Sequence, residues 1–407
     1  MKKYLMTLTM LAITNAAIAA ETPTVTLSGK LNTQYGSISN KGRFKNADSS
    51  PTGASLNNKA IVNNTRIFVD AEGKAPNGLK YGGRIELFAD ASASTSGNKN
   101  IADKTYLYAE SMFGRLEVGA VKGVSNQMAV YAGSIAAATG GIDGDASDWF
   151  PEDPLNDGSL PTGATGSDYY YTRYQVSPGL PTYTEYASSA NKINYLTPRI
   201  AGFQVGFSYI PDIQLKGTVS RMHTVTHQQG KGYKNIFDAS ASYEGKYSDV
   251  SYAASIGFEA GDDKTSSIGD VKKDLRAWVA GAQIGYKGFS VAGSYGSWGK
   301  TLTPANPTSG NKYGTQHWTL GAAYEYKDAS VSLTYFESKR GNAYADIFPV
   351  EFDVTKNKFS MLSIGADYKL APGFKPYAEV NLFSFKRQAE PYNNKGNVVL
   401  IGTKLAF

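Results

Sequence analysis

A two-residue periodicity runs through almost the whole chain and restricts its fold more than any other feature. In the segment FQVGFSYIP, for example, Phe203, Val205 and Phe207 share one parity, while Gln204 and Gly206 fall on the other. Successive side chains of a β-strand point to opposite sides of a sheet, so this segment is predicted to be a strand with one apolar face. The other face is small and polar, which fits a wall that meets water in a confined space.

Sixteen segments carry this alternation, an even number. They span residues 24–37, 61–73, 79–91, 103–111, 115–122, 190–197, 202–210, 234–245, 247–259, 273–287, 288–298, 315–327, 329–339, 357–370, 373–385 and 397–407. Tight turns such as MFG and YKG alternate with longer polar connections such as EAGDDKTSSIGDVK. Short turns on one rim and long loops on the other are typical of bacterial outer-membrane barrels. The sequence therefore predicts an all-β fold, a transmembrane antiparallel β-barrel of sixteen strands.

Aromatic residues favour this barrel over a soluble β-sandwich. Trp278 and Tyr286 lie eight residues apart on one expected outer face, and Trp318 and Tyr326 repeat that spacing. Eight residues span roughly 26 Å along a strand, or about 20 Å of height once the strand is tilted. Such pairs fit the two aromatic girdles of a lipid-embedded barrel, whereas a sandwich would place large aromatics at mid-strand, in its core.

The first residues have the organisation of a secretory signal peptide. Lys2 and Lys3 precede an apolar stretch at 4–13, and the residues at 17–19, Ala-Ile-Ala, match a small-x-small cleavage site. An anchor helix would need about 20 apolar residues, more than this segment has. We therefore expect a signal peptide at residues 1–19 and one mature barrel domain at residues 20–407.

Composition excludes several functions. The chain has no Cys, which removes disulfides, thiolate metal sites and Cys nucleophiles. Its net charge of +6 comes without a basic run, so nucleic-acid binding is not expected. No later stretch of 18 apolar residues occurs, which excludes membrane crossing by helices. We expect neither a cofactor nor a bound metal.

Two stretches, KTYLYAESMFGRLEVGAVKG and NKINYLTPRIAGFQVGFSYIPD, carry a family resemblance. With TVTLSGKLNTQYG near the start and the final strand, they resemble the general trimeric porins of Gram-negative outer membranes. The resemblance implies a long third external loop folded into the lumen, a homotrimer, and passive diffusion of small hydrophilic solutes and ions. It also implies contact with outer-membrane lipid, lipopolysaccharide and the outer-membrane assembly machinery. One departure is that Ala120 follows Gly119, where family members commonly carry Arg.

The longest connection, residues 123–189, is the segment to which the resemblance assigns the constriction. It holds eight acids and a single base, Arg173. A sixteen-stranded barrel leaves a lumen too wide to discriminate small solutes, and a loop folded inward would narrow it. The acids expected to line the constriction are Asp143, Asp145, Asp148, Glu152 and Asp153.

The wall opposite the loop follows from strand parity. Alternation places Arg66, Arg84 and Lys192 on the lumen side of their strands. The fourth strand would present Tyr106 and Tyr108 inward, where the family often has a base. Loop acids facing these bases would create a transverse field that filters solutes by charge. Because acids dominate, we expect a weak preference for cations.

Other functions stay open on the residues alone, including a substrate-specific outer-membrane channel for sugars or anions and a surface adhesin. An enzyme is not expected: His223 and His227 lie in a polar loop without a Glu partner, and His317 begins a strand near the outer rim, where it would face solvent. The acids of DGDASD are spaced like part of a calcium loop that lacks its downstream Glu. The tyrosines at 169–171 and 174 would either guide sugars or pack the loop on the wall.

The final segment, NVVLIGTKLAF, ends the strand pattern on Phe407. In a barrel the last strand closes against the first, so we expect residues 397–407 to pair with TVTLSGKLNTQYG. Phe407 and Leu405 would then face lipid, and Lys404 the lumen. The resemblance implies that Phe407 and Leu405 belong to a signal read by the assembly machinery.

Overall fold

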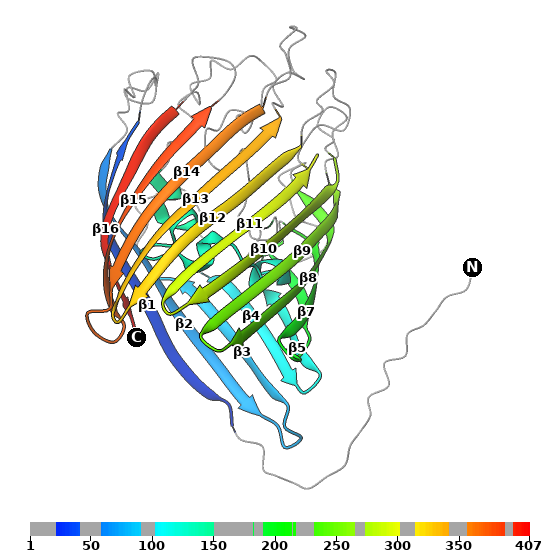
Figure 1. Cartoon of the computed structure of the whole chain (residues 1–407). Coiled ribbons are helices and arrows are strands. Elements are labelled where there is room, and N and C mark those ends of the chain that lie inside the picture. The colour runs from blue at the N-terminus through cyan, green and yellow to red at the C-terminus, as the bar shows by residue number, and fades with distance from the viewer. Residues whose placement is uncertain are drawn as a thin grey trace.

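A computed structural model gives the fold of the chain (Figure 1). It describes residues 22–40, 58–90, 102–149, 182, 190–213, 215–216, 232–264, 273–301, 314–341, 356–386 and 394–407. The expected signal peptide, the tyrosines at 169–171 and 174, and most of the third loop after residue 149 lie outside the described residues.

Sixteen strands make up most of the described backbone. They are β1 (Thr24–Ser39), β2 (Lys59–Lys74), β3 (Lys80–Phe88), β4 (Ala102–Ser111), β5 (Gly114–Ala120), β6 (Asn191–Leu196), β7 (Phe203–Asp212), β8 (Tyr233–Tyr247), β9 (Val250–Asp263), β10 (Leu275–Tyr286), β11 (Phe289–Gly299), β12 (Thr315–Tyr326), β13 (Ala329–Gly341), β14 (Lys356–Tyr368), β15 (Phe374–Lys386) and β16 (Asn394–Ala406). Every expected strand is confirmed, with its ends shifted by a few residues at most.

The strands close into one antiparallel barrel in which each strand pairs with its neighbours along the chain. The seam joins β1 to β16, where Leu31 lies opposite Leu405. Gly29 and Phe407 extend it, because the Gly29 N–H donates to the Phe407 carbonyl (2.9 Å) and the Phe407 N–H to the Gly29 carbonyl (3.1 Å). The ring of described strands therefore has no free edge, as a lipid environment requires.

Tight turns join the strands at one rim. In the hairpin between β10 and β11, Lys287 and Gly288 have φ angles of 46° and 88°. Positive φ at both central residues is the geometry of a type I′ turn, whose twist matches that of paired strands. Glycine adopts it without strain, which explains the YKG signature of this rim.

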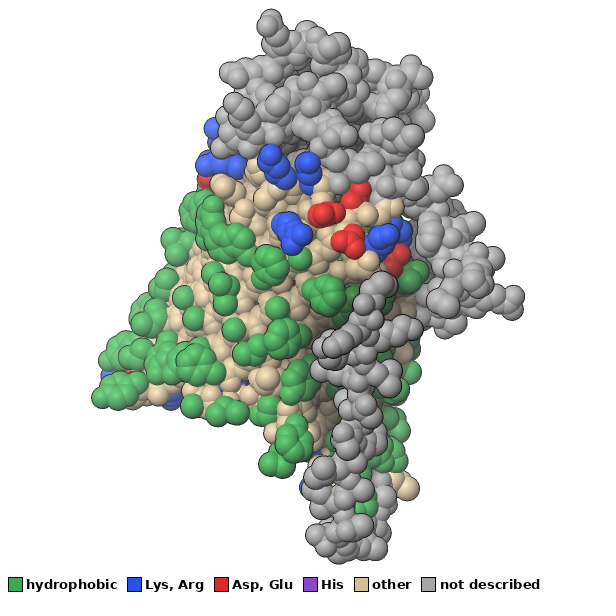
Figure 2. Space-filling view, turned by 90° about the vertical axis from the view of Figure 1, so that its right-hand side faces the viewer, with side chains coloured by type: hydrophobic (Ala, Val, Ile, Leu, Met, Phe, Trp, Pro, Cys, Tyr) green, Lys and Arg blue, Asp and Glu red, His purple; other side chains and the backbone are tan. Residues whose placement is uncertain are grey.

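The outer face of the barrel carries the large apolar side chains, which Figure 2 shows as green patches below the grey segments. Trp278, Tyr286, Trp318 and Tyr326 are all exposed, as their parity predicts. The two members of each pair lie near opposite ends of the same strand, β10 or β12. They mark two aromatic levels on the outer surface.

The described helices are short and lie inside the ring of strands (Figure 1). They are α1 (Val124–Gln127), η3 (Ala132–Ile135), η4 (Gly141–Asp143) and η5 (Asp145–Trp149), of which the last three are 3₁₀-helices. Within the described ranges, no helix has the length and apolar character needed to cross a membrane.

Candidate functional site

The first part of the third loop, residues 123–149, follows the inner wall of the barrel. α1 packs on β7, β8 and β9, and η3 packs on β11, β12 and β13. η4 then packs on β13, β14 and β15, and η5 on β16 and β1. The chain thus passes from strand to strand as far as the seam. The expected inward-folded loop is confirmed for its described part.

Glycines on the inner wall make room for the loop backbone. A Cβ atom placed on Gly281 of β10 would lie 1.8 Å from the carbonyl oxygen of Val130. One placed on Gly365 of β14 would lie 3.1 Å from that of Ala137. Similar close approaches to α1 and η3 occur at Gly206, Gly257 and Gly321. The small residues of the inner face therefore make room for the loop. The alternation alone predicts that this face meets water.

Hydroxyl groups on the wall accept hydrogen bonds from the loop backbone. The donor and acceptor pairs, at 2.8 to 3.1 Å, are Val124 N–H with Ser208, Val130 N–H with Ser255, Ala132 N–H with Thr319 and Ala137 N–H with Ser332. Short helices leave most of their backbone N–H groups without partners of their own. An unsatisfied buried group costs about 1–3 kcal/mol, so these serines and threonines stabilise the loop in this path.

Two wall carboxylates hold the loop at separate points. Asp238 of β8 accepts hydrogen bonds from the backbone N–H and the hydroxyl of Ser125 in α1. Glu379 of β15 accepts from the N–H groups of Thr139 (3.0 Å) and Gly141 (3.3 Å). Both carboxylates are almost fully buried. Hydrogen bonds to ionised groups are stronger than neutral ones, so these contacts are the firmest polar anchors of the loop.

Trp149 anchors the end of η5 to the seam. A Cβ atom on Gly36 of β1 would lie 2.1 Å from the indole ring, so only glycine leaves space for it. The ring packs against a hydrophobic cluster that includes Ile142 of the loop and Leu400 of β16. This packing places the acidic residues of η5 beside β16 and β1.

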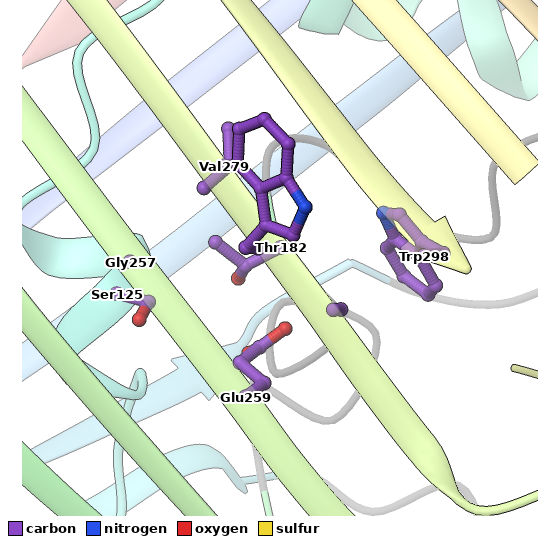
Figure 3. Close-up of a pocket in the computed structure, with 8 residues that line it drawn as sticks. Ser125, Thr182, Gly257, Glu259, Val279 and Trp298 are labelled. Atoms are coloured by element: carbon purple, nitrogen blue, oxygen red, sulfur yellow. The ribbon is translucent and has the colours of Figure 1, made fainter.

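A cleft between the loop and strands β9 to β11 is lined by Ser125, Thr182, Glu259 and Trp298, among others (Figure 3). Its empty volume is about 170 Å³. The lining side chains leave no room for the centre of a water molecule, whereas typical ligand pockets measure roughly 300–1,000 Å³. We interpret this cleft as residual packing space under the loop and not as a solute site.

Beyond the end of the described loop path, β2 to β4 carry paired charges. Arg66 forms ion pairs with Glu86 (2.5 Å) and with Asp103. Lys104 contacts the same two carboxylates at 3.1 and 2.8 Å. The four side chains are 10–18% exposed. Two bases and two acids cancel, so this network adds little net charge to the wall.

Arg84 is the most accessible of the predicted bases, with 41% of its side chain exposed. It donates two hydrogen bonds to Asp70, at 2.6 and 2.9 Å. Tyr106 lies opposite Arg84 on β4, and the Tyr108 hydroxyl donates to Glu72 (2.6 Å). The structure therefore brings Arg84, Tyr106 and Tyr108 together with the Arg66 network on neighbouring strands.

Lys192 lies elsewhere. It is 2% exposed, and its ammonium group donates to the carbonyl oxygens of Val121 and of Ala190, the latter at 2.7 Å. Val121 precedes the loop and Ala190 follows it, so Lys192 joins the two ends of the loop. Parity predicts the side of the strand but not the loop that covers this residue.

Three of the predicted constriction acids are described, and Glu152 and Asp153 lie outside the described residues. Asp143 accepts a hydrogen bond from the Tyr131 hydroxyl (2.6 Å). Asp145 accepts one from the Asn32 amide of β1 (2.7 Å). Asp148 lies in η5, between Asp145 and Trp149. Asp145 and Asp148 of η5 are therefore held close to the seam, whereas Asp143 lies in η4, which packs on β13 to β15.

Asp145 interacts electrostatically with two bases, Lys30 of β1 and Lys404 of β16. Strand parity alone did not assign these bases to the constriction. Burial raises the pKa of Asp145, and the charge of Lys404, the Asn32 hydrogen bond and the charge of Lys30 oppose that rise. Lys404 also donates to the Ala138 carbonyl (2.6 Å). The inward parity of Lys404 is readable from the sequence, but its partner depends on how far the loop travels.

His317 is buried, and the expectation that it faces solvent is wrong. A Cβ atom on Gly296 would lie 2.4 Å from the imidazole, so the ring fills the space that this glycine leaves. Neither ring nitrogen has a hydrogen-bond partner among the described residues. His223 and His227 lie outside the described residues. Within the described ranges, no group of three or more His, Asp or Glu side chains could hold a metal ion.

A closed barrel of sixteen antiparallel strands with a loop folded along its inner wall defines a channel-forming barrel of the outer-membrane type. The chain matches the family model described as Gram-negative porin over residues 7–388. It belongs to that family. Family and fold together support an outer-membrane porin channel and point away from an enzyme.

Two relatives and two solved structures are similar to the chain. The chain is 26% identical to an uncharacterized protein of Rickettsia felis and 25% identical to one of Rickettsia conorii, with 100% of each chain covered. It resembles the anion-selective porin from Comamonas acidovorans, with a TM-score of 0.56 at 15% identity over 95% of this chain and 100% of the other. It also resembles an outer membrane protein of Vibrio cholerae from which loop L8 is deleted. The TM-score is 0.54 at 12% identity, over 95% of this chain and 100% of the other. At such identities the likeness shows the fold.

Proposed function

We propose that the pore passes small hydrophilic solutes and ions by diffusion, and that it filters them by size and charge between the third loop and the wall of β1 to β4. The observation that supports this most is the position of Asp145, on the loop and within electrostatic reach of Lys30, Arg66 and Lys404. Acids and bases on facing sides of a narrow pore produce a transverse field that orients dipolar solutes.

We propose a weak preference for cations. Arg66, Lys104 and Arg84 on the wall each pair with carboxylates, which compensate their charge. The loop at 123–189 holds eight acids against one base. The balance of fixed charge therefore favours positive ions in the pore.

The charge filter is tested by reversal potentials across planar bilayers in a potassium chloride gradient. Wild type should favour potassium, and a variant with Asp143, Asp145 and Asp148 replaced by Asn should favour it less. A matched control replaces three exposed acids at the rims, Asp249, Asp262 and Asp328, and should behave as wild type. A wild type that favours chloride would refute the cation preference. An unchanged ratio in the loop variant would refute the filter.

Narrowing by the loop is tested by single-channel conductance. Deletion of residues 141–157 removes η4, η5 and the Trp149 anchor, so the conductance should rise. Unchanged conductance in a folded barrel would show that this segment does not narrow the pore.

We also propose export through a signal peptide at residues 1–19, with residues 20–407 inserted in the outer membrane by its assembly machinery. The two lysines, the apolar stretch and the small-x-small site at the N-terminus support this. Intact mass of the protein purified from outer membranes should correspond to a chain that starts at residue 20. A retained N-terminus would contradict cleavage.

A homotrimer is the oligomer we propose. On the outer face Thr33 of β1 lies opposite Asn63 of β2, and both are exposed. Polar side chains are costly on a lipid-facing surface, and a contact between subunits would cover them. Native electrophoresis should show a trimer for wild type and smaller species for Asn63→Arg. A monomeric wild type would refute the proposal.

A further inference from the structure

A row of lysines lies on the outer face of the barrel, near the rim that carries the long connections. In the register of β13, β14 and β15, Lys339 lies directly opposite Lys358, and Lys358 directly opposite Lys386. Phe385, which precedes Lys386, and Phe359, which follows Lys358, are both buried on the inner side. Because side chains alternate along a strand, the lysines point outward.

Charges of one sign directly opposite each other destabilise a sheet. Glu337 is the acid that compensates this row, at 3.0 Å from Lys339 and 2.7 Å from Lys358. Lys339 and Lys358 nevertheless keep 47% and 37% of their side chains exposed. Lys386 is exposed, and no carboxylate pairs with it among the described residues. One carboxylate for three ammonium groups leaves the row positively charged.

The two rows below the lysines, toward the middle of the barrel, change in a regular way. The first contains Ser360 of β14 opposite Ser384 of β15, with Glu337 of β13 and Lys395 of β16 at its two ends. The second contains Leu362 opposite Leu382. Strands β14 and β15 therefore each pass from leucine to serine to lysine over five residues, whereas β13 has Tyr335 and Glu337 at the matching positions. This is the profile of a surface that meets acyl chains below and charged headgroups above.

The row is not a general property of this rim. Between β8 and β9 the cross-strand pair near the same rim is Lys234 opposite Asp262, which has opposite charges. The lysine row therefore places like charges together in one sector of the barrel, and the described residues do not balance them. This points to a ligand that supplies negative charge.

We propose that Lys339, Lys358 and Lys386, with Ser360 and Ser384 below them, bind the phosphate of a membrane-lipid headgroup in the leaflet that surrounds the long connections. Ammonium and hydroxyl groups donate hydrogen bonds, and phosphate oxygens accept them. A lipid fits better than free phosphate because the leucines of the next row receive its acyl chains. The proposal rests on the outer-membrane location, but it does not depend on what the pore conducts.

The test uses the full-length barrel in detergent, with phosphatidic acid as the probe and diacylglycerol, which has acyl chains but no phosphate, as the uncharged reference. Native mass spectrometry measures the apparent Kd of each lipid. Because lysines near an anionic lipid surface add to one another in favouring binding, replacement of the three lysines by Gln should weaken phosphatidic acid binding by about a hundredfold. Diacylglycerol binding should not change.

Two matched variants control for charge and folding. Replacement of Lys246, Lys287 and Lys327, exposed at the short-turn rim, by Gln removes the same charge and should bind phosphatidic acid as wild type does. Replacement of the three row lysines by Arg keeps the charge and should retain binding. If the Gln variant does not fold, Glu337→Gln decides, because loss of the one described carboxylate in the row should tighten binding.

Equal phosphatidic acid binding by wild type and the row variant, in barrels of wild-type conductance, would overturn the proposal. So would unchanged binding by Glu337→Gln, or displacement of the lipid by inorganic phosphate at equal concentration. Wild-type conductance with lost lipid binding is the expected result, and it separates this site from the pore function.

Discussion

The substitution Gly281→Ala tests how closely the third loop lies on the inner wall. The Val130 carbonyl oxygen is 1.8 Å from the position that the new Cβ atom would take, and real Cβ contacts essentially never fall below 3.0 Å. The oxygen must therefore move by more than about 1 Å. It belongs to the backbone, so no side-chain rotation relieves the contact, and the loop itself has to shift.

The expected cost follows from the contacts at this point. Overpacking of a close contact costs about 1–3 kcal/mol. The shift also weakens the hydrogen bond from the Val130 N–H to the Ser255 hydroxyl (2.8 Å), which contributes about 1 kcal/mol. We expect the free energy of unfolding to fall by about 2–4 kcal/mol. Because the wall blocks movement outward, the loop moves toward the lumen and the conductance falls.

The assay combines urea unfolding of the barrel in phospholipid vesicles with single-channel conductance in planar bilayers. Gly293→Ala is the matched control, because Gly293 lies on the next strand and its nearest neighbours are Thr319 and Leu320 rather than the loop. The control should conduct as wild type does. Wild-type stability and conductance in Gly281→Ala would refute this path of the loop, and a higher conductance would refute the inferred direction of movement.

Three further predictions concern the root of the loop, its charge and the seam. Lys192→Met removes the donor to two carbonyl oxygens, so limited proteolysis within residues 123–189 should become faster. The control Lys246→Met should be cut at the wild-type rate, and equal rates in the two variants would contradict the role of Lys192. Burial raises the pKa of Asp145, so as pH falls this carboxylate is protonated at higher pH than an exposed Asp. The potassium preference should therefore begin to decline in that higher range, and a decline of the same shape in Asp145→Asn would argue against it. Phe407→Ala removes a ring that packs over Gly29 and should lower the yield of folded barrel in cells, with a wild-type yield as the opposing result.

Much of the fold is readable from local pattern. The alternation in FQVGFSYIP places Phe203 and Phe207 outward, and both are exposed on β7. The spacing of Trp278 and Tyr286 predicts the two outer levels where these side chains lie. The pairing of the last strand with the first is also confirmed. These features depend on the two-residue period of a strand and on the need to satisfy every backbone group, and a sequence displays both directly.

The site is readable only in part. Arg84 and Tyr106 lie together because parity and strand order place them so. Lys192 has the predicted parity, but its ammonium group lies under the loop. His317 has a polar side chain at a strand start, yet the ring is buried beside Gly296. Parity decides the side of the sheet on which a residue lies, and it carries no information on what covers that side.

By itself, the sequence determined the strands and their inner and outer faces, because these follow from neighbours along the chain. It also predicted that the first and last strands pair, because a sheet in lipid leaves no backbone edge unpaired. The tertiary structure alone decided the path of the loop, which places Asp145 beside Asn32 and Val130 on Gly281. It also decided the register that aligns Lys339, Lys358 and Lys386. Such contacts join residues far apart in the chain, and their geometry is set by closure of the whole barrel, which no local pattern contains.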